Sequence, residues 1–231
     1  MIKALTVRSF LVYLISYVIF SSPYGTAQEK EREGFDVGVD IVSSYIWRGL
    51  KYGSGPAVQP ALEYRMGIFA AGAWGSFDFR GYEEVDLYIV FSLPSGFSLG
   101  LTDYYSPKLR YFDCSRESGS HAIEMNLLYE GEKLKLSANY IFNHAGGIGS
   151  YGNDLYFEAG YSFSSFLLFA GAGNGWLTAD ADDEPKFELC NIGLEATSTI
   201  KITENFSLQI TGQLIFNPSS ERLYLTGLIS F

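Results

Sequence analysis

The sequence predicts an all-β fold: a membrane-spanning, antiparallel, up-and-down β-barrel of about twelve strands, preceded by a cleaved signal peptide. Three observations predict it. From Phe35 onward, apolar and polar residues alternate with a period of two, and helical spacing never extends over three turns. The alternating segments run about ten residues, the length of a tilted transmembrane strand. Tight turns also alternate with longer connections, as they do in membrane barrels.

Twelve ranges of the chain carry the predicted strands: 35–47, 57–66, 68–79, 84–93, 97–106, 121–130, 133–143, 154–163, 166–176, 187–201, 206–216 and 222–231. Tight turns are predicted at 66–67, 94–96, 131–132, 164–165 and 203–205, and longer connections at 48–56, 80–83, 107–120, 144–153, 177–186 and 217–221. This alternation predicts that both chain termini lie on the tight-turn side, in the periplasm. The other all-β interpretation is a soluble β-sandwich, which would bury the same apolar face against a second sheet.

Residues 1–27 are predicted to be a cleaved export signal. Lys3 and Arg8 give it a positive start, an apolar run follows at 10–20, and Ala27 precedes the cut. That run is short for a membrane-spanning helix, which needs roughly twenty apolar residues, so an uncleaved anchor helix is disfavoured. The mature chain is predicted to comprise a short periplasmic segment at 28–34 and the barrel at 35–231.

The last predicted strand ends the sequence at Phe231. This ending resembles the C-terminal signal that outer-membrane barrels present to their assembly machinery. The resemblance implies that machinery as a partner. A barrel in that membrane is also expected to contact outer-membrane lipid and lipopolysaccharide.

The formal net charge is −10, with 26 acidic residues against 16 Lys and Arg. This balance argues against nucleic acid as a partner, because a polyanion is bound through clustered Lys and Arg. Cys114 and Cys190 are too few for a cysteine metal site or a disulfide scaffold, and no cofactor is predicted. Both are expected on one side of the membrane. Either Cys114 and Cys190 form one disulfide, or they are two separate thiols, in which case Cys190 faces lipid.

Two motifs in the segment 36–79 resemble the opening of the TorF family of outer-membrane porins. The first is Tyr-x-Trp-Arg-Gly followed by Gln-Pro, and the second is Gly-x-Trp-Gly-Ser. The motif residues in this chain are Tyr45, Trp47, Arg48, Gly49, Gln59, Pro60, Gly72, Trp74, Gly75 and Ser76. The resemblance covers about the first quarter of the mature chain. It implies an outer-membrane location and a porin function, and it implies no catalytic residues.

The side chains predicted to line the lumen are charged, with acids in excess. They are Asp36, Asp40, Glu63, Arg65, Asp86, Glu124, Lys135, Glu158, Glu195, Lys201 and Arg222. If water fills the interior, such carboxylates attract cations and repel anions. The predicted function is therefore a channel for passive diffusion of small solutes, with a cation preference. The alternatives are a salt-bridged plug that does not conduct and a structural or adhesive surface barrel.

An enzyme inside a barrel is the competing class. Outer-membrane phospholipase A also has twelve strands and uses a His, a Ser two residues later and an Asn, and the segment that follows His144 resembles it in part. Gly146 stands where the Ser is needed, although Ser150 and Asn153 lie nearby. A Ser nucleophile needs an imidazole within hydrogen-bond reach, so no enzyme activity is predicted. The remaining histidine, His121, is predicted to have no Ser or acidic partner on its face.

Four carboxylates crowd the connection at 179–184. Oxygen-rich clusters can bind Ca²⁺, but this segment lacks the spacing and the turn glycine of an EF-hand loop. A solvated external loop is the favoured interpretation, and no metal site is predicted.

Overall fold

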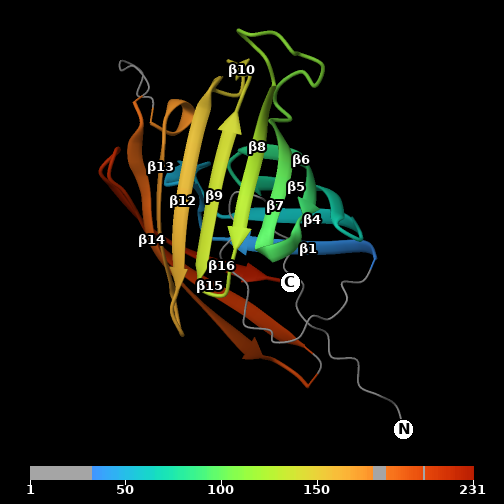
Figure 1. Ribbon diagram of the computed structural model, residues 1–231, viewed down its shortest axis with the longest axis vertical. Coiled ribbons are helices and arrows are strands. Elements are labelled where there is room, and N and C mark those ends of the chain that lie inside the picture. Colours follow the sequence, from blue (N-terminus) through green and yellow to red (C-terminus); the bar gives the residue numbers. More distant parts are fainter. Residues whose placement is uncertain (1–32, 179–185, 205) are drawn as a thin grey trace.

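The computed structural model describes residues 33–178, 186–204 and 206–231 (Figure 1). The predicted signal peptide at 1–27, most of the segment at 28–34 and the acidic connection at 179–184 lie outside the described residues. Within the described ranges, no helix is long and apolar enough to cross a membrane.

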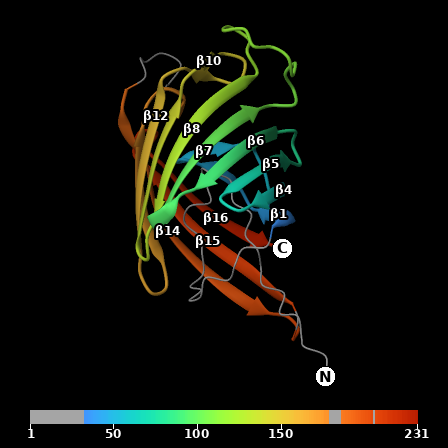
Figure 2. The same cartoon turned by 45° about the vertical axis from the view of Figure 1, so that its right-hand side comes forward.

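Twelve strands of the described chain form one closed antiparallel sheet, in which neighbours along the chain pair and the last strand pairs with the first (Figure 1, Figure 2). This confirms the predicted barrel and its strand number. The strands are β1 (Gly34–Val42), β4 (Ala57–Met66), β5 (Phe69–Asp78), β6 (Glu83–Ser92), β7 (Phe97–Tyr105), β8 (His121–Glu130), β9 (Leu134–Ile141), β12 (Asp154–Ser162), β13 (Leu167–Gly173), β14 (Glu188–Lys201), β15 (Ser207–Asn217) and β16 (Arg222–Ser230).

Strand β8 shows how side chains divide between the two faces of the sheet. Met125 and Leu127 are 52% and 43% exposed, whereas Glu124 and Asn126 are fully buried. A closed sheet has only an outside and an inside, so the apolar set faces the surroundings and the polar set faces the interior. Apolar outside and polar inside is the arrangement of membrane-spanning barrels. It is the reverse of a soluble sandwich, and the closed sheet rules that alternative out.

Tight turns and longer connections lie at opposite ends of the barrel, as predicted. Gly67 and Ile68 join β4 to β5, whereas residues 106–120 join β7 to β8. Gly67 adopts a positive φ of 59°, which suits a glycine in a tight turn. We call the end with the longer connections the loop end.

The barrel closes through a short seam between β1 and β16. Residues 40–42 pair with residues 228–230, and the Phe231 N–H donates a hydrogen bond to the Val39 carbonyl at 3.1 Å. Phe231 therefore takes part in closure, which matters because lipid leaves unpaired backbone groups unsatisfied. Its role as an assembly signal stays a prediction.

The first predicted strand, 35–47, is wrong at its end. β1 stops at Val42, and the chain then forms a separate hairpin of β2 (Tyr45–Trp47) and β3 (Leu50–Tyr52). Arg48 and Gly49 make its two-residue turn with φ values of 51° and 83°. Positive φ at both positions gives the twist that tight hairpins require. Alternation in sequence marked these residues as a strand but carried no information on which sheet they join.

Smaller departures occur at the loop end. The predicted strand at 166–176 stops at Gly173 and is followed by a short 3₁₀ turn, η2 (Gly175–Leu177). The predicted loop at 144–153 contains a minimal hairpin of β10 (His144–Ala145) and β11 (Ser150–Tyr151). At the opposite end of the barrel, the tight turn predicted at 94–96 forms a short 3₁₀ segment, η1 (Pro94–Gly96).

Candidate functional site in the barrel interior

The hairpin at residues 45–52, which we call the inward hairpin, lies inside the barrel. Tyr45, Ile46, Trp47 and Arg48 are each buried to at least nine-tenths, although they belong to a connection between strands. Trp47 packs against Tyr104 of β7, with ring centroids 5.4 Å apart. The first long connection therefore turns back into the lumen instead of extending away from it.

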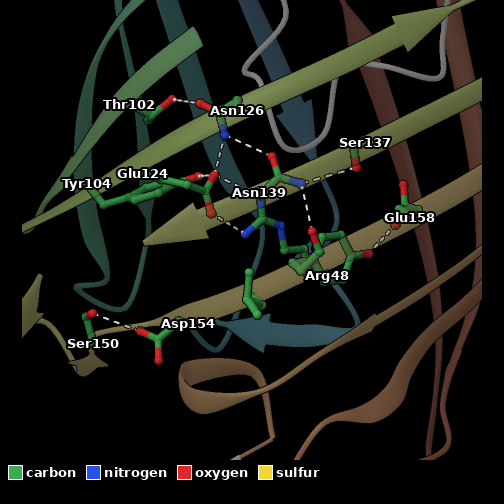
Figure 3. Close-up of polar contacts among 12 residues, drawn as sticks. Arg48, Thr102, Tyr104, Glu124, Asn126, Ser137, Asn139, Ser150, Asp154 and Glu158 are labelled. Carbon is green, nitrogen blue, oxygen red and sulfur yellow. Dashed lines mark hydrogen bonds and ion pairs between the residues drawn. The ribbon is translucent and has the colours of Figure 1, made fainter. Parts of the chain in front are cut away.

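Arg48 at the tip of the inward hairpin pairs with Glu124 of β8 (Figure 3). Its Nη1 lies 2.5 Å from Oε2 of the carboxylate and its Nη2 lies 2.9 Å from Oε1. The guanidinium also lies over the rings of Trp47 and Tyr156, at 4.5 and 4.4 Å from their centroids. A planar guanidinium matches both partners, because it bonds a carboxylate in two places and stacks on aromatic faces.

Gly49 brings the hairpin tip against the opposite wall. A Cβ at this position would lie 1.9 Å from the backbone oxygen of Cys190 in β14. Its carbonyl accepts a hydrogen bond from Nδ2 of Asn217 in β15 at 3.0 Å. Only glycine fits here, because the φ is positive and the approach to β14 is closer than any side chain allows. The tip thus spans the interior from β8 to β14 and β15.

A hydrogen-bonded network continues from Glu124 along the inner wall (Figure 3). Nδ2 of Asn126 donates to Glu124 at 2.5 Å and to Oδ1 of Asn139 at 2.9 Å. The hydroxyl of Tyr104 donates to Oε1 of Glu124 at 2.9 Å. Thr102 donates to Asn126 at 3.0 Å. Buried polar groups are stable when partners satisfy them, so this network fixes the rotamers of the wall that Arg48 meets.

Aromatic rings of the inward hairpin also pack against rings of β5 and η2. Tyr45 packs on Trp74 of β5 at 5.5 Å and on Tyr52 at 5.6 Å between centroids. Trp47 packs on Trp176 of η2 at 5.3 Å. Residues of both motifs therefore meet inside the barrel: Tyr45, Trp47 and Arg48 from the first motif and Trp74 from the second. They form the anchor of the inward hairpin.

The other motif residues surround this anchor or lie on the wall. Nε2 of Gln59 donates to the Ser76 hydroxyl at 3.1 Å, and both residues are buried. A Cβ at Gly72 would lie 2.4 Å from the Tyr88 hydroxyl, and one at Gly75 would lie 2.7 Å from the Phe77 ring. Pro60 is exposed on the wall of β4.

The residues predicted to line the lumen have different environments. The buried ones are Glu63, Asp86, Glu124, Lys135 and Glu195, and the partly buried ones are Asp36, Asp40, Arg65 and Glu158. Lys201 and Arg222 are exposed at strand ends. Their alternation follows the inner face, but each lies at the margin of the barrel, where water reaches it.

Several of these charges have partners among the described residues. Arg65 pairs with Glu63, which also accepts a hydrogen bond from the Tyr88 hydroxyl at 2.9 Å. Nζ of Lys135 lies 3.0 Å from a carboxylate oxygen of Glu130. Glu195 accepts a bond from Gln213 at 2.6 Å. Much of the interior is therefore a set of local pairs rather than free rings of charge.

Glu84 and Asp86 on β6 differ from these pairs. Asp86 is 1% exposed, and no side chain among the described residues donates a hydrogen bond to its carboxylate. Glu84 is 7% exposed, and the Tyr82 hydroxyl donates to its Oε2 at 2.9 Å. Glu84 was not among the predicted lumen residues. Its two-residue spacing from Asp86 was the available signal, because it places both carboxylates on one face of a strand.

The residues of the enzyme alternative do not assemble into a catalytic set. The Ser150 hydroxyl donates to Oδ2 of Asp154 at 2.8 Å and to the Asn143 carbonyl at 2.8 Å. The ring of His144 bonds the Tyr151 carbonyl at 2.9 Å instead of the serine. A nucleophile without an imidazole beside it is not activated.

The prediction for His121 is wrong. Its Nδ1 lies 2.9 Å from Oδ2 of Asp103 on the neighbouring strand β7, and its ring stacks on Tyr105 at 5.2 Å. His121 and Asp103 are 18 residues apart. The pair arises from strand register, which the sequence did not reveal.

The two cysteines are not bonded to each other. Cys114 is exposed in the connection at 106–120, and Cys190 is fully buried on β14. The alternative that Cys190 faces lipid is wrong, because an irregularity in the pairing of β13 with β14 shifts the register there. The bulge leaves Cys190 under the tip of the inward hairpin.

A scan against protein-family models found no match, and a search of curated proteins found none. Among solved structures, the chain is similar to two variants of the porin of Rh. blastica and to a BenF-like porin from Pseudomonas fluorescens Pf-5. The sequence identities are 11%, 12% and 14%, and the TM-scores are 0.40, 0.42 and 0.38. The matches cover 76%, 87% and 87% of this chain and 55%, 75% and 65% of those chains. The chain thus spans little more than half the length of the first porin, and the resemblance to the TorF family stays a prediction.

Proposed function

We propose that this protein is an outer-membrane, porin-like channel through which small solutes diffuse passively, with a preference for cations. Its chain termini lie in the periplasm, and its longer connections face the outside of the cell. The inward hairpin sets the narrowest point of the path. Support for the membrane location comes from the apolar outer face of a closed barrel.

The observation that carries the proposal is the charge on β6 beside the inward hairpin. Glu84 and Asp86 are buried, and no cationic side chain of the described chain bonds either of them. Burying an ionised carboxylate without water or a counter-ion costs several kcal/mol. Even a neutral polar group costs about 1–3 kcal/mol to bury without a hydrogen bond. A hydrated lumen that admits mobile cations removes this cost. Carboxylates in such a position favour cations over anions.

Planar-bilayer recording of the refolded, purified chain tests this function. Stepwise conductance and a reversal potential of the cation-selective sign are expected in a KCl gradient. Exchanging the β6 carboxylates for amides, Glu84→Gln and Asp86→Asn, should lower the ratio of cation to anion permeability. The matched control is Glu132→Gln, which removes one exposed carboxylate at a tight turn. Absence of conductance steps would contradict the proposal and favour a structural or adhesive surface barrel.

A phospholipase-type activity is the alternative from another class, and no observation in the interior favours it. The Ser150 hydroxyl bonds the Asp154 carboxylate and a backbone carbonyl, whereas the ring of His144 bonds the Tyr151 carbonyl, so the serine lacks the imidazole that this mechanism needs. Hydrolysis of a fluorescent phospholipid that stops on Ser150→Ala would nevertheless establish the enzyme and displace the channel.

A further inference from the structure

A cavity of about 280 Å³ lies at the loop end of the barrel, beside the inward hairpin. Its lining includes Tyr52 of the hairpin, Tyr82 and Glu84 near the start of β6, and Lys108 and Trp176 from later connections. The volume is close to the lower limit for small-molecule sites, which span roughly 300–1,000 Å³. We call it the loop-end cavity, and its size fits one small ligand.

Glu84 gives the inner wall of the loop-end cavity a carboxylate that no cationic side chain of the described residues bonds. Its carboxylate is buried and accepts hydrogen bonds from two neutral groups, the hydroxyls of Tyr82 and Tyr45. These donors satisfy its oxygens but bring no positive charge. A buried carboxylate is stabilised most by a cation at contact distance, because the low surrounding polarity strengthens the attraction.

Aromatic faces surround the same space. The rings of Tyr52 and Tyr82 lie 5.7 Å apart between centroids with their planes tilted by 54°. Trp176, which also lines the cavity, is held by Trp47 and Tyr104 at 5.3 and 5.9 Å. Ring faces attract cations, and Trp and Tyr bind alkylated ammonium groups better than they bind small hydrated ions.

The remaining charged groups of the lining leave the balance negative. Glu83 and Glu84 contribute two carboxylates, and Lys108 contributes one ammonium. Lys108 is exposed, so water and salt screen it, whereas Glu84 is buried. A cation that enters the cavity therefore meets its strongest partner at the inner wall.

We propose that the loop-end cavity binds a small organic cation with an alkylated ammonium group, with Glu84 as its counter-ion and with Tyr52 and Trp176 as the rings that contact it. The inference deepens the proposed function by naming the class of cation that the channel samples before the inward hairpin. That the cation then passes through the barrel rests on the proposed channel function, but binding in the cavity does not require that the barrel conducts.

Tetramethylammonium chloride is the probe. The full chain, refolded in detergent micelles, is titrated while tryptophan fluorescence is recorded, with NaCl holding the ionic strength constant. We expect a saturable change that disappears in Trp176→Phe, because only that tryptophan lines the cavity among the described residues. Glu84→Gln should weaken the apparent affinity about tenfold, which corresponds to about 1.4 kcal/mol. Tyr52→Leu should weaken it about threefold or more.

Two controls keep the outcomes separate. Glu117→Gln removes an exposed carboxylate outside the cavity and should leave the affinity unchanged. tert-Butanol, a neutral molecule of similar shape, should bind far more weakly than tetramethylammonium. Equal binding of the two molecules, or an affinity unchanged by Glu84→Gln in a variant that still shows heat-modifiable migration, would overturn the site. Binding without conductance would instead overturn the channel and leave the site standing.

Discussion

Arg48 and Glu124 lie 76 residues apart in the chain and form a bidentate ion pair inside the barrel, with nitrogen–oxygen distances of 2.5 and 2.9 Å. Their side chains are 2% and 1% exposed. Removing one partner of such a pair leaves the other charge buried alone and typically costs about 3–5 kcal/mol. The pair therefore acts as a latch that holds the inward hairpin to β8.

Arg48→Ala should release the inward hairpin. Glu124 then loses its counter-ion, and the hairpin tip loses its attachment to β8. We expect single-channel conductance to at least double. The midpoint of urea unfolding should fall, because the free energy of unfolding drops by about 3 kcal/mol or more. Conductance recordings and urea titration of the same preparation measure both effects.

Lys51→Ala is the matched control for the latch, because it removes one positive charge from an exposed position of the same hairpin. It should leave conductance and stability unchanged. Equal effects of Arg48→Ala and Lys51→Ala would show that charge alone, rather than the latch, controls the path.

Gly49→Ala should destabilise the hairpin tip through its backbone. The added Cβ meets the Cys190 carbonyl at 1.9 Å, and the φ of 83° is strained for any residue other than glycine. Backbone strain of this kind costs about 1–3 kcal/mol before the clash is counted. Gly55→Ala in the same connection is the control, since its Cβ meets nothing within 4 Å. Thermal unfolding should separate the two variants, and equal melting temperatures would contradict the assigned contact.

The two thiols should report on the position of the inward hairpin. In the folded protein a maleimide reagent should label exposed Cys114 rapidly and buried Cys190 only on unfolding. In Arg48→Ala, labelling of Cys190 should accelerate about tenfold or more, because the tip that covers it has moved. Mass spectrometry of the labelled peptides gives both rates. A Cys190 rate that is equal in the two proteins would mean that the hairpin stays in place without the latch.

Met125→Arg should oppose insertion into a bilayer. Met125 lies halfway along β8 on the outer face, where a lipid-exposed arginine costs about 2–4 kcal/mol. Heat-modifiable migration after folding into liposomes should show a smaller folded fraction. Phe112→Arg, at a 91% exposed residue of the connection at 106–120, is the control and should fold normally. Equal folding of both variants would argue that β8 does not face lipid.

Order in the connection at 106–120 should depend on the charge of Asp113. Hydrogen bonds from the Ser115 hydroxyl and backbone N–H, and from Ser118, hold the pKa of Asp113 below its usual value of about 3.9. A lowered pKa in the folded state means that the ionised form stabilises the loop above the ordinary pKa. That contribution is lost as the pH falls through the lowered pKa.

Trypsin should therefore cleave Asp113→Asn after Arg110 and Arg116 faster than it cleaves the parent chain at pH 7. Glu117→Gln changes the same charge in the same connection, makes none of these bonds and should leave the rate of cleavage after Arg110 unchanged. Equal rates for Asp113→Asn and the parent would show that the bonds to Asp113 do not order the loop.

The sequence by itself determined the wall of the barrel. Alternation of period two is a local property, so strands such as β8, the division of Met125 and Glu124 between its faces, and the order of tight turns and long connections follow from residues close together in the chain. Each strand of the barrel pairs with the strands before and after it along the chain, so the order of strands in the sheet follows from their order in the sequence. This is why the strand number and the barrel were predictable without the structure.

Only the tertiary structure decided what occupies the interior. The residues at 45–47 alternate like a strand of the wall, and they turn inward because Arg48 finds Glu124 on β8 and Gly49 fits against Cys190 on β14. The pairing of His121 with Asp103 and the burial of Cys190 depend in the same way on register and on a bulge. Such contacts join residues that are distant in sequence, and their energy depends on a geometry that exists only once the barrel has closed.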